Sequence, residues 1–115
     1  MSREQESLAV LVRLQRRIEN RLGGDPNQSY VAALYRGGLD RILQKLGEEA
    51  VEVLIAGKNA DDDALVREMA DLWFHSLLLL SARGLEVQAV AAELAQREGR
   101  SGLAEKAARD LTGRK

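Results

Sequence analysis

The feature that most constrains the fold is the spacing of the glycines, which divide the chain into segments with helical periodicity. Single glycines or glycine pairs follow successive amphipathic segments, where they are typical of helix C-termini. The composition favours the same interpretation, because Leu and Ala occur 19 and 16 times in 115 residues, whereas Pro occurs once. A β-sandwich would need more β-branched and aromatic residues. We therefore expect an all-α fold.

Apolar spacing and capping residues place the individual helices. Ser29 is a good N-cap for a short second helix, and Asn59 or Asp61 can cap the fourth. A chain of this length supports one domain, so we assign residues 1–115 to a single small bundle of about five helices. The tail, about 101–115, is expected to be partly flexible with one more helical turn. The predicted helices cover residues 6–22, 29–35, 39–56, about 60–83 and 87–97.

Charge and residue usage exclude several classes of function. The net charge of −1 provides no global basic field for nucleic acid. With no cysteine and one histidine, the chain has neither a thiolate nor a His-rich zinc site. No segment resembles a signal peptide, and the most apolar stretch is about half the ~20 residues that a membrane span needs. We expect a soluble cytoplasmic protein without a nucleic-acid or membrane partner.

The segment from Met69 to Leu80 is apolar almost all round, which is typical of a helix buried on most sides. A chain with so few helices can hardly cover it alone. We therefore expect a homodimer whose interface includes Trp73, Leu77 and Leu80.

Carboxylates recur at a spacing of three on the third and fourth predicted helices. Glu48, Glu49 and Glu52 lie on the third, and Glu68 and Asp71 on the fourth. At ~100° per residue, Glu49 falls at the edge of the apolar face rather than on the solvent side. A short loop makes the two helices antiparallel neighbours. Four or five carboxylates can then converge on one place.

Such a cluster must be neutralised, because like charges at 4 Å repel by roughly 4 kcal/mol per pair at an effective dielectric of 20. An all-oxygen site suits Mg²⁺ or Mn²⁺. The alternative is a pair of solvated charged faces, on which Lys45 and Glu49 form an ordinary i,i+4 pair. A di-iron bundle would need two Glu-x-x-His motifs, and the chain has a single histidine.

The acidic pattern and the residues around it resemble a known family. Glu-Glu-x-x-Glu followed after fifteen residues by Glu-x-x-Asp resembles the signature of the MazG-like all-α nucleoside triphosphate pyrophosphohydrolase superfamily. Over residues 6–110 the chain resembles the phosphoribosyl-ATP pyrophosphohydrolase family within it. It departs from that family at Glu86, where Ser or Thr is common, which predicts a weaker helix cap. The more specific resemblance is carried by residues 29–30, 38–42, 45–50, 58–59, 70–75 and 101–106.

The resemblance implies Mg²⁺-dependent hydrolysis of 1-(5-phosphoribosyl)-ATP to 1-(5-phosphoribosyl)-AMP and pyrophosphate, the second step of histidine biosynthesis. It implies that Glu49, Glu52, Glu68 and Asp71 are metal ligands. Glu48 would complete a second metal site or orient the attacking water.

Basic residues are needed to hold the phosphates of such a substrate. Lys45 on the third predicted helix and Lys58 in the loop between the two acidic helices are candidates. Lys106 and Arg109 in the tail are candidates for the extra 5′-phosphate, in the same or the other subunit. His75 either donates a hydrogen bond to a ligand carboxylate or is structural.

Other residues near these motifs are assigned lesser roles. Tyr30 is a packing residue or stacks on adenine. Arg16 and Arg17 are expected on a solvated helix face.

Two other functions stay open. One is a house-cleaning hydrolase of the same superfamily acting on ordinary or damaged nucleotides, and the other is a non-catalytic helical interaction module.

Overall fold

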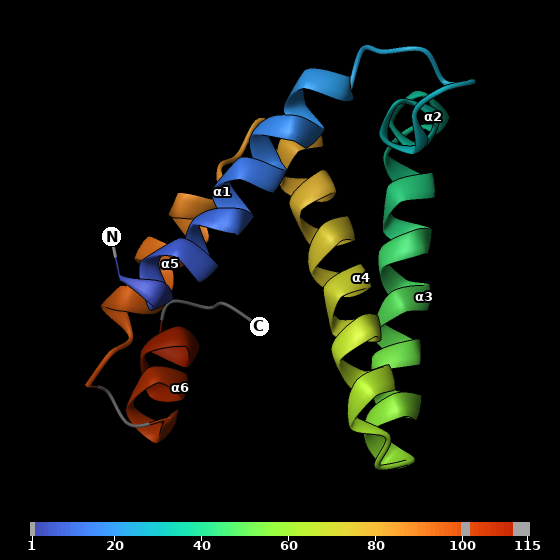
Figure 1. The fold of residues 1–115 in the computed structure, drawn as a ribbon. Coiled ribbons are helices and arrows are strands. Elements are labelled where there is room, and N and C mark those ends of the chain that lie inside the picture. Colours follow the sequence, from blue (N-terminus) through green and yellow to red (C-terminus); the bar gives the residue numbers. More distant parts are fainter. Residues whose placement is uncertain (1, 100–101, 112–115) are drawn as a thin grey trace.

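The computed structural model describes residues 2–99 and 102–111, and within them the chain is all-helical, as predicted (Figure 1). None of the helices there combines the length and apolar character needed to cross a membrane. The six helices are α1 (Arg3–Arg21), α2 (Tyr30–Gly37), α3 (Leu39–Lys58), α4 (Asp62–Ala82), α5 (Val87–Gln96) and α6 (Gly102–Leu111).

Helix ends differ from the predicted ones where caps were overlooked. α1 begins at Arg3 rather than Glu6, because Ser2 and Gln5 form a capping box with hydrogen bonds of 2.8 and 3.1 Å. α3 continues to Lys58, which is therefore helical and not a loop residue. Asp61 caps α4 by accepting a hydrogen bond from the Ala64 amide at 3.0 Å, which confirms one of the two predicted caps.

The tail is more regular than expected, since α6 has ten residues instead of one turn. It forms no extensive contact with another described helix. In Figure 1 it lies on the α5 side of the molecule, away from α3 and α4. The tail was expected to be partly flexible over about 101–115, of which residues 101 and 112–115 lie outside the described residues.

The core is built around the antiparallel pair of α3 and α4, which make the most extensive contact in the fold (Figure 1). α1 packs across α4, and α2 packs on α3. The apolar faces meet in one cluster, formed by Ile18, Val31, Leu34, Ile42, Leu77 and Leu78. This arrangement holds the facing sides of α3 and α4 in a defined register.

Gln15 ties α1 to the α4–α5 connection. Its side chain is buried and donates to the Leu85 carbonyl at 2.9 Å and to the Ser81 hydroxyl at 3.2 Å. The Val87 amide donates to the Gln15 Oε1 at 2.6 Å. Glu86 forms no side-chain cap, as expected, and Gln15 takes over one of the free amides of α5.

The apolar face of α4 is only partly covered within one chain. Trp73 is 50% exposed and Leu80 is half-buried. Leu77 is 4% exposed within one chain and belongs to the core cluster, and it also lines the apolar groove beside Trp73 and Leu80.

Candidate metal centre

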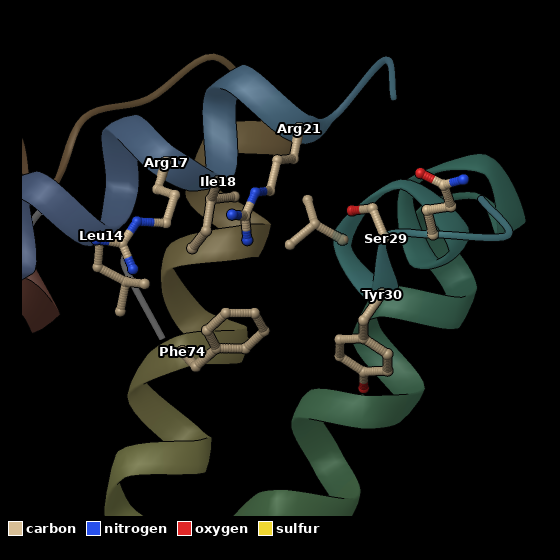
Figure 2. A pocket seen from close by; sticks show the side chains of 9 residues that line it. Leu14, Arg17, Ile18, Arg21, Ser29, Tyr30 and Phe74 are labelled. Carbon is tan, nitrogen blue, oxygen red and sulfur yellow. The ribbon is translucent and has the colours of Figure 1, made fainter. Parts of the chain in front are cut away.

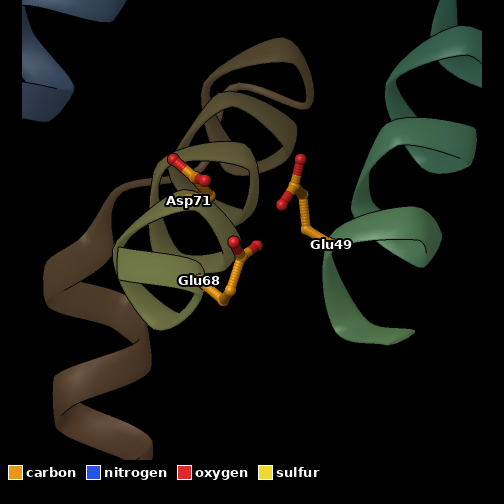
Figure 3. Close-up of side chains that lie close together, drawn as sticks. All are labelled: Glu49, Glu68 and Asp71. Carbon is orange, nitrogen blue, oxygen red and sulfur yellow. The ribbon is translucent and has the colours of Figure 1, made fainter. Parts of the chain in front are cut away.

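Three carboxylates from two helices meet between α3 and α4. Glu49 extends from α3 toward Glu68 and Asp71 on α4, as Figure 3 shows. One oxygen from each of the three lies within 4.8 Å of the others. Glu49 is buried, Glu68 is half-buried and Asp71 is exposed, so the cluster opens to solvent on one side. This confirms that the predicted acidic pairs converge.

The helical register explains this convergence. Glu49 lies two turns after Ile42, a core residue, and therefore on the buried face of α3. Glu68 and Asp71 are three residues apart, so they share the face of α4 that α3 covers. The short connection after Lys58 makes the helices antiparallel and aligns the two pairs.

The electrostatics of the cluster are unfavourable for ionised carboxylates. Glu49 Oε2 and Glu68 Oε2 are buried without a hydrogen-bond partner. Burial raises the pKa of the Glu49 carboxyl, and the charges of Glu52 and Asp71 raise it further. The pKa of Glu68 is raised first by a hydrogen bond with the Glu52 carboxyl, which requires a proton, and then by burial. Glu52 is exposed but lies against both residues.

A hard divalent cation fits these residues. The donors are all carboxylate oxygens, which Mg²⁺ and Mn²⁺ prefer. Two of them lack any partner in the buried part of the cluster, and an unpaired buried acceptor is costly. The arrangement can therefore hold a metal ion through Glu49, Glu68 and Asp71, with Glu52 beside them.

The raised pKa values predict how stability depends on pH without metal. Glu49 and Glu68 bind protons more tightly when folded, so the unfolding free energy falls as pH rises from their ordinary value of 4.5 through their raised native values. Above that range the stability contributed by these two protonated groups is lost completely. Melting curves in chelator from pH 4 to 8 should show the melting temperature decline as pH rises, and the decline should be smaller in Glu49→Gln. An identical pH profile in the variant would contradict the assignment.

Glu48 lies outside the cluster of Glu49, Glu68 and Asp71, and its role at a second metal site or on the attacking water stays a prediction. Its side chain faces outward, where it pairs with Lys45 at 3.2 Å and accepts from Gln44 Nε2 at 3.2 Å. The Lys45 contact lowers the pKa of Glu48. The reason is angular, since Glu48 is ~100° around the helix from Glu49.

His75 joins the cluster to α2 instead of to a carboxylate side chain. It is buried, and its Nδ1 donates to the Asp71 backbone carbonyl at 2.8 Å. Because Nδ1 carries that proton, Nε2 of the neutral ring accepts from the Tyr30 hydroxyl, also at 2.8 Å. Sequence reasoning did not foresee the Tyr30 contact, although the position of Tyr30 directly after the Ser29 cap fixes its direction.

The expected phosphate-binding cations are not brought together. Lys45 lies one helical turn before Glu49. The pKa of Lys45 is raised chiefly by its hydrogen bond with Glu48, and the Glu49 charge adds a smaller contribution. Lys58 is at the far end of α3. Lys106 and Arg109 lie on α6, on the α5 side (Figure 1). Within one chain the tail cations and the acidic cluster are separate.

Comparison with known proteins identifies the family of this chain. Residues 11–98 match the sequence model of the family described as Phosphoribosyl-ATP pyrophosphohydrolase. A phosphoribosyl-ATP pyrophosphatase of Methylibium petroleiphilum is 51% identical over 105 residues, covering 91% of this chain and 88% of the relative. One from Neisseria gonorrhoeae is 52% identical over 101 residues, covering 88% and 94%. The chain belongs to the phosphoribosyl-ATP pyrophosphohydrolase family.

Proposed function

We propose that this chain hydrolyses 1-(5-phosphoribosyl)-ATP to 1-(5-phosphoribosyl)-AMP and pyrophosphate in histidine biosynthesis, as a single-domain cytoplasmic enzyme. The observation that carries the proposal is the cluster of Glu49, Glu68 and Asp71, with two buried oxygens that lack partners. Family membership supplies the substrate class, because the relatives carry that activity in their names.

The residues of the cluster fit this reaction. A triphosphate carries about four negative charges and is repelled by bare carboxylates, so Glu49, Glu68, Asp71 and Glu52 would hold Mg²⁺. When bound, Mg²⁺ neutralises the phosphates and lowers the pKa of coordinated water. Water adds to the α-phosphorus, the bond to the bridging oxygen breaks, and pyrophosphate leaves. Lys45, next to this cluster, is the nearest candidate among the expected cations for contacting the phosphates.

A substrate panel tests the proposal. With Mg²⁺ present, phosphoribosyl-ATP and the canonical triphosphates are offered separately, and products are identified by phosphorus NMR. Phosphoribosyl-AMP and pyrophosphate from the first compound, with little turnover of the others, is the expected result. Equal hydrolysis of ordinary triphosphates would favour the house-cleaning alternative. Absence of both hydrolysis and divalent-ion binding would favour an interaction module.

We also propose that the enzyme is a homodimer. An apolar groove of about 400 Å³ lies between α1, α4 and α5, with Trp73 and Leu80 of α4 on its wall. Further apolar side chains are exposed on α3, among them Leu54 at 70%. Exposed apolar surface of this extent is typical of an interface.

Light scattering at micromolar concentration should give twice the 12.7 kDa chain mass. Trp73 is the only tryptophan, so its emission should shift to longer wavelength when dilution separates the subunits. Trp73→Arg should be monomeric with an unchanged helical circular-dichroism signal, because Trp73 is half exposed in one chain. A wild-type monomer would refute the proposal.

A further inference from the structure

A cavity of about 330 Å³ lies between α1, the start of α2 and α4 (Figure 2). Arg17 and Arg21 enter it from α1, and the Tyr30 and Phe74 rings border it from α2 and α4. None of these side chains has a part in the hydrolytic cluster described above. The combination of two guanidinium groups with two aromatic rings raises the question of what this cavity binds.

The two arginines are available for an anion. They are four residues apart and thus on one face of α1, and Figure 2 shows both extending toward the cavity. Within residues 2–99 and 102–111, neither guanidinium has an ion pair or hydrogen bond. Guanidinium groups present several N–H donors in a planar fork that matches phosphate oxygens. Arg17 is exposed, as expected for a solvated helix face, and it also borders this cavity.

The cavity adjoins the acidic cluster. Tyr30, in its wall, donates to His75, which in turn donates to the Asp71 carbonyl, with both hydrogen bonds at 2.8 Å. Phe74 lies three residues after Asp71 on α4. The Tyr30 and Phe74 rings are 6.2 Å apart between centroids and inclined by 30°. A ligand that spans the acidic cluster and the cavity would therefore have phosphates at the carboxylates, a flat ring near Tyr30 and Phe74, and an anion at the arginines.

We infer that Arg17 and Arg21 bind the phosphate monoester on the ribose that phosphoribosyl-ATP carries in addition to ATP. This inference rests on the proposed function and identifies the residues that distinguish the substrate from an ordinary triphosphate. Tyr30 and Phe74 lie beside the purine between the two ends. The competing cations are Lys106 and Arg109, which in one chain lie on the α5 side (Figure 1).

Binding of products tests the inference without turnover. Titration calorimetry of the full chain compares phosphoribosyl-AMP with AMP, which lacks the second ribose together with its phosphate. Arg17→Ala and Arg21→Ala should each weaken phosphoribosyl-AMP binding about 10- to 100-fold, as for loss of charge-assisted hydrogen bonds. AMP affinity should stay within about twofold. The matched control is Arg16→Ala, which removes an exposed arginine of the same helix that does not line the cavity.

The possible outcomes are distinct. Equal loss of AMP and pyrophosphate affinity in the arginine variants would overturn the inference, because the guanidinium groups would then hold the nucleotide's own phosphates. Unchanged phosphoribosyl-AMP affinity in the Arg17→Ala and Arg21→Ala variants would also overturn the inference. So would a preference for phosphoribosyl-AMP over AMP that is lost only in a Lys106→Ala/Arg109→Ala variant. If the wild-type chain neither hydrolyses phosphoribosyl-ATP nor prefers phosphoribosyl-AMP over AMP, the proposed function itself fails.

Discussion

Glu49→Gln and Asp71→Asn should each reduce kcat for phosphoribosyl-ATP at least about 100-fold while leaving the protein folded. Each change removes one negative charge from the cluster at almost constant volume. The metal-assisted stabilisation that depends on these charges amounts to several kcal/mol, and about 1.4 kcal/mol corresponds to tenfold in rate. Single-turnover kinetics at saturating Mg²⁺ would measure the loss directly.

The same variants should be as stable as the wild type or more stable. The pKa of Glu49 is raised by burial and by neighbouring acids, so its ionised form opposes folding at neutral pH. Glu93→Gln is a suitable control, because Glu93 forms only a surface pair with Arg97 at 3.1 Å. Glu48→Gln should lose less activity than Glu49→Gln, since Glu48 faces outward. Normal Mg²⁺-dependent turnover in Glu49→Gln or Asp71→Asn would refute the role of that residue.

The convergence of Glu49, Glu68 and Asp71 could largely be predicted because it depends on local periodicity. Angular position along a helix decides that Glu49, but not Glu48, faces α4, and one short loop decides that α3 and α4 are antiparallel. Glu48 is ~100° around α3 from Glu49 and pairs with Lys45, so its expected role at a second metal site or on the attacking water stays a prediction. Helix ends were predicted well at most glycines and at Asp61. They were predicted less well at Gly57, which α3 passes on its way to Lys58, and at Ser2, whose capping box precedes the apolar pattern.

Features that depend on how helices distant in the sequence cross could not be predicted from helical periodicity. The contact between Tyr30 and His75 requires the start of α2 to reach α4, 45 residues along the chain. The cavity lined by Arg17 and Arg21 arises from three helices that meet there. The spacing of these two arginines was visible in the sequence, but a charged i,i+4 pair on a helix is usually a solvated face.

Removal of divalent ions should abolish turnover, and their return should raise the melting temperature as well as restore activity. An ion that binds only the folded chain stabilises it by about 2.7 kcal/mol at 100 times its Kd. For a domain of this size that corresponds to roughly 10 °C. The shift measures binding without any substrate, so it also distinguishes a metal enzyme from an interaction module.

The acid cluster adds a pH dependence to this stabilisation. Protons and metal compete for Glu49 and Glu68, whose pKa values are raised, so the shift caused by Mg²⁺ should grow as pH rises above 4.5 and level off once both groups are ionised. Glu49→Gln should show a much smaller shift at every pH, whereas the Glu93→Gln control should match the wild type. Scanning fluorimetry of chelator-treated protein, with Mg²⁺ and Mn²⁺ titrated separately, measures the melting-temperature shift of the wild type and of both variants. If the wild type shows no shift with either ion and remains active in excess chelator, the carboxylates do not form a metal centre, because their mutual repulsion would then be relieved by protons alone.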